Sequence, residues 1–243
     1  MASAAEVLFP SRICVSLGHH DPETLLKLGH LEAERGETFF EFCLEFLTDP
    51  KNGPHIIRDF LRHWPHAWII ATCRRQERNF QGCIEDQLAV LGEAVEAGAR
   101  GIDLEIETAR HNRQWMHDMG LQCTRIVSYH NHHGCPALGP ILRELESIPA
   151  DLIKVAVKAG NSGTLHRLAQ AAGKCTKPNL MLMMGKEGLP LRIMAPILGR
   201  SFTYASPAGH EGTASGQLDA SILREILHLD QLEIKAPLAV ATR

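Results

Sequence analysis

The chain has 243 residues, of which 44% are apolar and 22% are charged, and its formal net charge is −3 at pH 7. This composition is ordinary for a globular protein and provides no basic face for nucleic acid. No apolar run approaches the roughly 20 residues that a membrane helix needs, and the first residues lack the basic and apolar regions of a signal peptide. We therefore expect a cytoplasmic protein without a nucleic-acid or membrane partner.

The seven cysteines are scattered and include no Cys-x-x-Cys pair. An odd, dispersed set argues against a disulfide framework and against a structural zinc knuckle. Several of these cysteines fall within predicted strands, where a free thiol behaves as a small apolar side chain.

Apolar segments typical of strands alternate along the chain with segments of helical periodicity. Most of the strand-like segments are continuous apolar runs, as parallel strands buried on both faces require. The predicted strands are residues 12–16, 39–47, 68–72, 101–106, 125–129, 152–157, 179–184 and 202–204.

Helices are predicted to begin near positions 21, 53, 84, 136, 165 and 218, and a weaker, mostly polar helix is predicted over 108–119. Pro22 and Pro54 stand in the first turn of their helices, where a missing N–H costs nothing. In the third helix, apolar residues at 84, 88, 91 and 95 keep helical spacing until Gly98.

Eight such βα units predict an α/β fold, a (β/α)8 TIM barrel in a single domain over 1–243, with 230–243 as a C-terminal tail. A doubly wound open sheet is the alternative, but no Gly-x-Gly-x-x-Gly follows the first strand.

The active site of such a barrel lies at the carboxyl ends of its strands. Cations, histidines and carboxylates gathered there suit a small anionic, polyhydroxylated substrate. The polar residues expected there are His19, His20, Glu41, Glu45, Thr72, Arg74, Arg75, Asp103, Glu105, Glu107, His130, Asn131, His132, His133, Lys154, Lys158, Lys186, Arg192 and Gln217.

Two ionisable residues stand inside apolar strand segments. Lys154 lies within Leu-Ile-Lys-Val-Ala-Val, and His130 ends the run Arg-Ile-Val-Ser-Tyr-His. Burial disfavours an ammonium, so we expect the pKa of Lys154 to fall toward neutrality, which makes its amine a Schiff-base nucleophile with His130 as proton shuttle. The competing interpretation is a lysine that reaches solvent at a strand end and a histidine satisfied in the core.

Five segments with a common order and spacing extend this observation. They are Ser128-Tyr129-His130, Asp151-Leu-Ile-Lys154-Val-Ala156, Met184-Gly185-Lys-Glu-Gly188-Leu-Pro-Leu-Arg192, Gly199-Arg-Ser-Phe-Thr203-Tyr204 and Thr213-Ala214-Ser215-Gly216-Gln217. Together they resemble the type I 3-dehydroquinate dehydratases, and the resemblance covers nearly the whole chain.

The resemblance implies a lyase that converts its small-molecule partner, 3-dehydroquinate, to 3-dehydroshikimate with no metal and no organic cofactor. Lys154 would form an iminium with the C3 ketone. His130 would remove the C2 proton and then protonate the departing C1 hydroxyl, in a syn elimination. A homodimer is a further expectation, since exposed apolar residues on the helix faces could form a dimer interface.

The resemblance also assigns substrate-binding residues. Arg192 would pair with the substrate carboxylate through its planar fork. Arg74 and Glu41 would bind ring hydroxyls or position His130. The remaining assignments place Thr213 and Gln217 in a loop that closes over the substrate, and Met184 and Tyr204 in apolar walls.

The chain departs from the family pattern in several places. Cys43 and Glu45 stand where the family has arginine and aspartate, so a substrate-facing cation is missing; one charged hydrogen bond is worth roughly 1.5–3 kcal/mol. The segment 74–80 lacks the family's Gly-Gly pair; either Glu77 replaces the family's acidic residue there, or the register of the loop is shifted. The other departures are Asn131-His132 in place of Asp-Phe, Thr213 in place of serine and Ser215 in place of proline.

Three alternatives stay open at this point. One is a paralogue that uses the same Lys/His chemistry on a related hydroxy-ketone acid. Another is a non-enzymatic binding barrel, which the altered second and third strands motivate. The third is a metal-dependent barrel hydrolase or isomerase with ligands from His19, His20, His130, His132, Asp103 or Glu105.

Overall fold

The structure is a computed structural model that describes residues 9–75, 80–158, 163–197 and 201–227. Its strands form one parallel sheet that curls into a barrel, in the order β7-β6-β5-β4-β3-β2-β1-β8-β9. The strands are β1 (Ile13–Leu17), β2 (Phe39–Cys43), β3 (Trp68–Thr72), β4 (Gly101–Glu105), β5 (Thr124–Asn131), β6 (Leu152–Lys158), β7 (Asn179–Met184), β8 (Thr203–Ser206) and β9 (Leu218–Asp219). The predicted TIM-barrel fold is thus confirmed, and in the described sheet no ladder joins β7 to β8.

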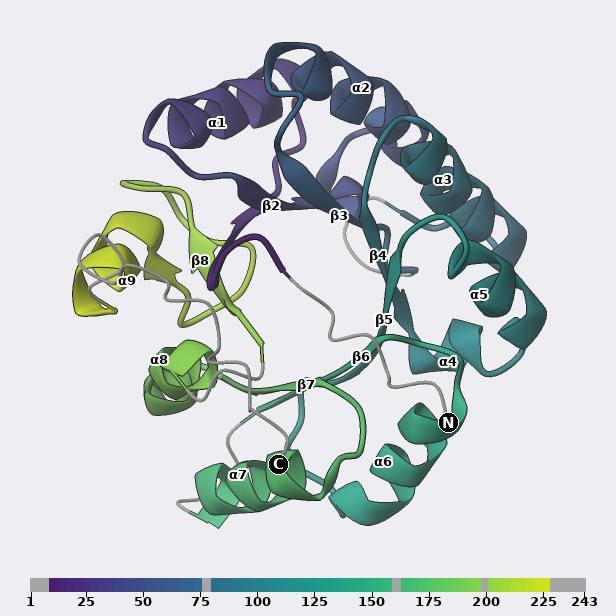
Figure 1. Ribbon diagram of the computed structural model, residues 1–243, viewed down its shortest axis with the longest axis vertical. Helices are drawn as coiled ribbons and strands as arrows, with labels where there is room; N and C mark the ends of the chain where they lie inside the picture. The colour runs from purple at the N-terminus through teal and green to yellow at the C-terminus, as the bar shows by residue number, and fades with distance from the viewer. Residues whose placement is uncertain (1–8, 76–79, 159–162, 198–200, 228–243) are drawn as a thin grey trace, which may run out of the picture.

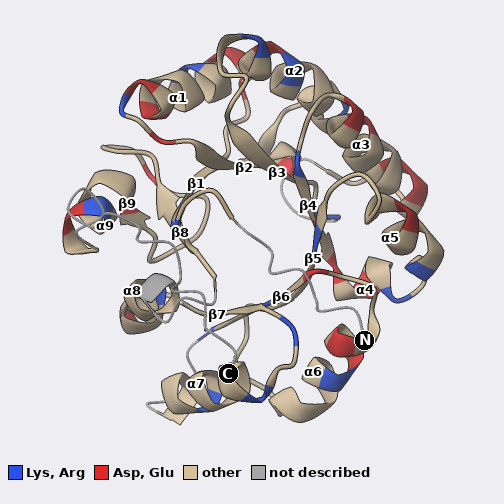
Figure 2. Cartoon of the chain, viewed as in Figure 1, with Lys and Arg blue, Asp and Glu red and all other residues tan. Residues whose placement is uncertain are grey.

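The helices form an outer ring around the strands, as Figure 1 shows. Much of the blue and red that marks Lys, Arg, Asp and Glu positions in Figure 2 falls on these helices. The helices are α1 (Pro22–Glu34), α2 (Gly53–His63), α3 (Ile84–Glu96), α4 (Ile106–Ala109), α5 (Arg113–Met119), α6 (Leu138–Ser147), α7 (Gly163–Lys174), α8 (Leu189–Ile197) and α9 (Ala220–Ile226), with short 3₁₀ turns η1 (Leu44–Phe46), η2 (Pro50–Asn52) and η3 (Lys186–Gly188). None of these described helices is long and apolar enough to cross a membrane.

Some predicted boundaries were wrong. The strand expected over 39–47 ends at Cys43, because the chain then turns through η1 and directs Glu45 toward β3. The helix expected over 108–119 is two helices, α4 and α5, since Asn112 takes a non-helical conformation between them. Positions 218–219 form β9 rather than helix, and β5 runs two residues past its predicted end. The predicted tail over 230–243 lies outside the described residues.

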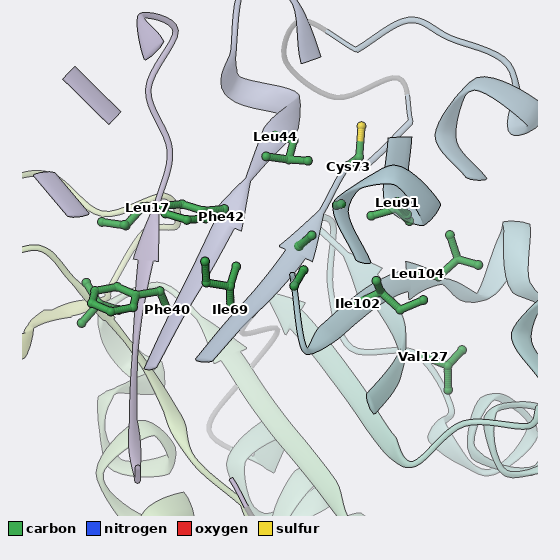
Figure 3. Close-up of a cluster of buried hydrophobic side chains, with 14 of the residues drawn as sticks. Leu17, Phe40, Phe42, Leu44, Ile69, Cys73, Leu91, Ile102, Leu104 and Val127 are labelled. Atoms are coloured by element: carbon green, nitrogen blue, oxygen red, sulfur yellow. The ribbon is translucent and has the colours of Figure 1, made fainter. Parts of the chain in front are cut away.

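The outer core fills the space between the strands and the helices. Successive side chains of a strand point to opposite faces of the sheet, so each buried strand contributes alternate residues to this layer. Figure 3 shows its members from β1 to β5 and α3, with Leu17, Phe40, Phe42, Leu44, Ile69, Cys73, Leu91, Ile102, Leu104 and Val127 labelled.

The inner core fills the barrel itself. Aromatic rings at the amino-terminal end form a plug: Phe39 lies 4.8 Å from Phe202 and 5.1 Å from Trp68, and Phe9 lies 4.7 Å from Phe202, between ring centroids. Above the plug, Leu180, Leu182, Ala156 and Tyr204 continue the apolar lining. Aromatic rings thus fill the amino-terminal end of the barrel.

Replacing Phe39 with alanine is expected to lower the free energy of unfolding by about 3–5 kcal/mol, because Phe39 is fully buried in the plug. Urea unfolding monitored by circular dichroism measures this change. Leu121→Ala is the matched control, since that side chain is 84% exposed and its removal should cost less than about 0.5 kcal/mol. Equal losses in the two variants would contradict the packing described here.

Candidate active site

A cavity of about 270 Å³ opens at the carboxyl ends of the barrel strands. Nine of its lining residues are those that the sequence predicted for catalysis and substrate binding: Glu41, Arg74, His130, Lys154, Met184, Arg192, Tyr204, Thr213 and Gln217. The structure therefore brings all nine together. The other lining residues are Phe46, His132, Ala156, Leu182, Ala214 and Ser215.

Lys154 projects from β6 into the centre of the cavity and is only 3% exposed. Its Nζ donates to Asp103 Oδ2 at 2.7 Å, to the Tyr204 hydroxyl at 3.2 Å and to Glu41 Oε1 at 3.4 Å. The ammonium also lies 4.4 Å from the centre of the Tyr204 ring, so this residue is more than an apolar wall. A lysine enclosed in this way does not reach solvent.

The pKa of Lys154 differs from the sequence expectation. Burial lowers it, but the negative charges of Asp103 and Glu41 outweigh burial and raise the pKa above its ordinary value. The prediction of a neutral amine was therefore wrong for the protein without substrate. Lys154 is held as an ammonium paired with two carboxylates.

Arg74 follows β3 and points into the same charged cluster. Its guanidinium nitrogens lie 2.9 Å from Glu45 Oε1, 3.5 Å from Asp103 Oδ2 and 3.9 Å from Glu41 Oε1. Burial raises the pKa of Asp103, but Lys154 and Arg74 outweigh it and lower that pKa to about 2. Burial outweighs Arg74 at Glu45 and raises the pKa of that carboxyl. The guanidinium of Arg74 is thus already paired with three carboxylates.

Cys43 ends β2 and contributes no cation of its own to this side of the cavity. Its Sγ lies 3.5 Å from both Ser16 Oγ and Glu41 Oε2, and burial followed by the charge of Glu41 raises the pKa of the thiol. Cys43 is therefore a neutral, poorly nucleophilic group at this position.

Ser16 connects the cluster to the loop after β8. Its hydroxyl donates to Glu41 Oε2 and shares a 2.6 Å hydrogen bond with Thr213 Oγ1. Gln217 in turn accepts from the Ala214 N–H at 3.2 Å, which shapes the loop. Ser16 was not among the predicted site residues, although a polar residue inside the first apolar strand is a signal that it faces the barrel interior.

The loops after β7 and β8 meet across the gap in the sheet. Gly185 N–H donates to Ser215 O at 3.3 Å, and both Gly185 and Gly216 have positive φ values of 88° and 81°. A Cβ at Gly216 would lie 2.3 Å from the Gly185 carbonyl oxygen. This close approach requires glycine and fixes the loop that carries Thr213 and Gln217.

His130 lies near the end of β5 and lines the cavity beside Lys154. Burial, followed by the positive charges of Arg74 and Lys154, lowers its pKa well below the ordinary value, although Asp103 opposes them. The imidazole is therefore neutral at pH 7. Its Nδ1 is buried without a hydrogen-bond partner in the described part of the chain.

Arg192 projects from α8 and is 2% exposed. One guanidinium nitrogen donates weakly to Ser215 O at 3.4 Å, and Nε is buried without a partner among the described residues. No described carboxylate lies within ion-pair distance, and burial lowers the pKa of Arg192 to about 10. A buried cation that no described carboxylate pairs with is suited to an anionic ligand.

Other polar residues expected at the strand ends have different roles. Glu105 accepts from the Arg75 N–H at 3.0 Å and from Gln87 at 2.7 Å, and burial raises its pKa to about 7. Glu77 lies outside the described residues. The residues His19, His20, Glu107, His133, Lys158 and Lys186 are not among those that line the cavity in the described ranges.

The described residues include no group of three His, Cys, Asp or Glu side chains that could hold a metal ion. The metal-dependent alternative therefore gains no support from the arrangement of side chains. All seven cysteines are free thiols in this structure.

Several known proteins resemble this chain in sequence and fold. The family profile of type I 3-dehydroquinase matches residues 13–234. The 3-dehydroquinate dehydratase of Desulfotalea psychrophila is 31% identical over 229 residues, which cover 88% of this chain and 96% of that protein. The corresponding protein of Dehalococcoides mccartyi is 28% identical over 202 residues, covering 81% and 87%.

Solved structures show the same fold. The crystal structure of 3-dehydroquinate dehydratase from Geobacillus kaustophilus superposes with a TM-score of 0.80 at 19% identity and covers 92% of each chain. The type I enzyme of Clostridium difficile gives a TM-score of 0.76 at 19% identity, covering 90% of this chain and 91% of that one. With the match of the family profile over most of its length, the chain belongs to the type I 3-dehydroquinase family.

Proposed function

We propose that the chain dehydrates 3-dehydroquinate to 3-dehydroshikimate through a Schiff base on Lys154, with His130 as general base and acid. The observation that carries this proposal is that one cavity holds a buried lysine, a neutral histidine and a buried arginine that has no carboxylate within ion-pair distance among the described residues. The amine provides the nucleophile, the imidazole the proton shuttle and the guanidinium the site for a carboxylate. The named activity of the relatives supports the same conclusion.

The chemistry starts at the C3 ketone. Lys154 Nζ attacks this carbon, the carbonyl oxygen leaves as water, and a cationic C=N bond remains. Neutral His130 removes the C2 proton, and the electrons of the C–H bond form an enamine. The enamine nitrogen then re-forms the C=N bond, and the electrons of the C2=C3 bond form a C1=C2 double bond as the C1–O bond breaks. The imidazolium protonates the departing hydroxyl, which leaves as water. Hydrolysis of the iminium releases the unsaturated ketone and Lys154.

Substrate orientation follows from the charges around the cavity. Arg192 would bind the carboxylate, which neutralises a buried cation that otherwise has only weak partners. On the opposite side, Glu41 and Ser16 would receive ring hydroxyls. Thr213 and Gln217 would cover the substrate from the loop after β8.

A second candidate is the same Lys/His chemistry on a related hydroxy-ketone acid. Cys43 favours it, because a neutral thiol stands where the family has an arginine. Arg74 does not replace that cation, since it already contacts three carboxylates. Such a substrate would need fewer anionic or hydroxyl groups on the strand-2 side of the cavity.

The test combines turnover with chemical trapping. The purified protein is mixed with 3-dehydroquinate and borohydride, which reduces an iminium to a stable amine. Product formation with an adduct on the peptide that contains Lys154 is the expected result in intact-mass and peptide mass spectrometry. An adduct without turnover, with faster trapping of a related hydroxy-ketone acid, would favour the second candidate. A folded protein that gives neither product nor adduct would exclude both.

Substitution of Gly216 by alanine is expected to lower kcat/KM about 5–150-fold, because the positive φ and the Gly185 carbonyl together cost about 1–3 kcal/mol of loop closure. Most of the effect should fall on KM, and steady-state kinetics measures it. Gly139→Ala is the control: a Cβ there meets only Arg143 at 3.6 Å, inside α6, and should stabilise the helix slightly. Unchanged kinetics in the Gly216 variant would show that the loop does not cover the substrate.

A further inference from the structure

Asp103 makes the shortest polar contact to Lys154. It lies on β4, is 2% exposed, and its Oδ2 lies 2.7 Å from Lys154 Nζ, against 3.4 Å for Glu41 Oε1. Arg74, 3.5 Å from Oδ2, helps to keep this carboxylate ionised. The other oxygen, Oδ1, is buried without a hydrogen-bond partner in the described part of the chain. Asp103 is thus a fixed negative charge directed at the nitrogen of Lys154.

The proposed reaction keeps a positive charge on that nitrogen. An ammonium and a ketone give an iminium and water: the nitrogen loses two protons, both bound to the carbonyl oxygen in the water that leaves, and the C=O bond is replaced by C=N. The remaining N–H and the positive charge stay on the nitrogen. A carboxylate placed on the ammonium is therefore also placed on the iminium, without any rearrangement of the protein.

We propose that Asp103 is a catalytic residue, the counter-ion of the reacting nitrogen both before the substrate binds and in the iminium. This inference rests on the proposed function, since it assigns a role within the Schiff-base reaction. Asp103 thereby opposes the release of the first proton from Lys154 and then stabilises the cationic intermediate. Glu41 is less suited to this role, because its second oxygen accepts from Ser16.

Ionisable groups on six strands or strand ends surround Lys154, so the effect of Asp103 on its charge has to be separated from the effects of the other groups. Glu41 acts in the same direction as Asp103, whereas Arg74 opposes both. The remaining ionisable neighbours are His130, Tyr204 and Cys14, which interact electrostatically with Lys154 or hydrogen-bond to it. Asp103→Asn removes the closest charge while keeping the shape of the side chain.

The first measurement needs no substrate. Lys154 is reductively methylated with formaldehyde and borohydride over a range of pH, and its peptide is quantified by mass spectrometry. Loss of the Asp103 charge should increase the methylation of Lys154 about tenfold or more below pH 9, since one pKa unit corresponds to tenfold in the neutral amine. Glu45→Gln is the control, because this buried carboxylate contacts Arg74 and has no hydrogen bond to Lys154.

The second measurement follows trapping of 3-dehydroquinate with borohydride. For Asp103→Asn we expect the acidic limb of adduct formation against pH to move to lower pH by one unit or more, because the pKa of Lys154 falls. We also expect the adduct yield at pH 7 to fall about tenfold, because the iminium loses its counter-ion. Asp103→Glu retains the negative charge, so the acidic limb of its adduct-formation profile should lie at the same pH as in the wild-type protein. Asp103→Ser provides a second neutral variant should the asparagine variant not fold, as thermal unfolding will show.

The outcomes separate this role from the proposed function. An unmoved methylation profile in folded Asp103→Asn, or a loss of adduct that is uniform across pH, would show that Asp103 is only structural. Absence of any adduct on the wild-type protein would instead remove the proposed function, whatever the methylation experiment gives.

Discussion

Lys154→Ala is expected to lower kcat/KM by on the order of 10⁴-fold or more and to abolish the borohydride adduct, because no other group in the cavity can form the iminium. Stopped assays with concentrated enzyme would measure the residual rate. The substitution also removes one of the two cations that pair with Asp103 and Glu41 and leaves only Arg74 near them among the described cations, so a loss of up to about 3–5 kcal/mol in unfolding free energy should accompany it. Activity is therefore compared well below the melting temperature of the variant.

Lys158→Ala is the matched control for this substitution. Lys158 ends the same strand but is exposed and does not belong to the residues that line the described cavity. Its removal should leave turnover, adduct and stability close to the wild type. Turnover within tenfold of the wild type in Lys154→Ala would contradict the assignment of the nucleophile.

His130→Ala is expected to lower kcat by about 10²–10⁴-fold while keeping the borohydride adduct, since the imidazole acts after the iminium has formed. This combination distinguishes it from Lys154→Ala. Because the pKa of His130 is lowered well below its ordinary value, the neutral base persists as the pH falls through 6.5. The acidic limb of the wild-type kcat profile that belongs to this base should therefore lie below pH 6.5.

His133→Ala is the control for the histidine, because His133 is exposed and donates to Asn131 Oδ1 through its backbone N–H, which the substitution keeps. It should retain both the rate and the pH profile. If His130→Ala lost the adduct together with turnover, His130 would be needed to form the iminium and its role in the elimination would have to be reconsidered.

The barrel and the gathering of the site residues could be predicted from sequence for a physical reason. Each strand is a continuous apolar run, so an isolated polar residue within it, such as Lys154, has to face the barrel interior or a strand end. Parallel strands then bring these residues to one mouth. This rule predicted six of the nine site residues that line the cavity, and the family resemblance supplied Met184, Tyr204 and Thr213.

The charge state of Lys154 could not be predicted in the same way. It depends on Asp103 and Glu41, which are 51 and 113 residues away along the chain and approach only when the sheet curls. A local sequence pattern reports burial, which lowers the pKa, but not the two carboxylates that raise it. The pairing of Arg74 with Glu45 was missed for the same reason, since the turn at η1 that directs Glu45 toward β3 was expected to be strand.

The order of the strands has a consequence for how the protein is made. β1 pairs with β2 on one side and with β8 on the other, through Ile13–Val15 and Thr203–Ala205. During synthesis the first strand therefore keeps an unpaired edge until nearly 200 further residues have left the ribosome. A chain truncated before β8 should expose that edge and aggregate, and a chaperone that shields β1 would be needed for longest on the growing chain.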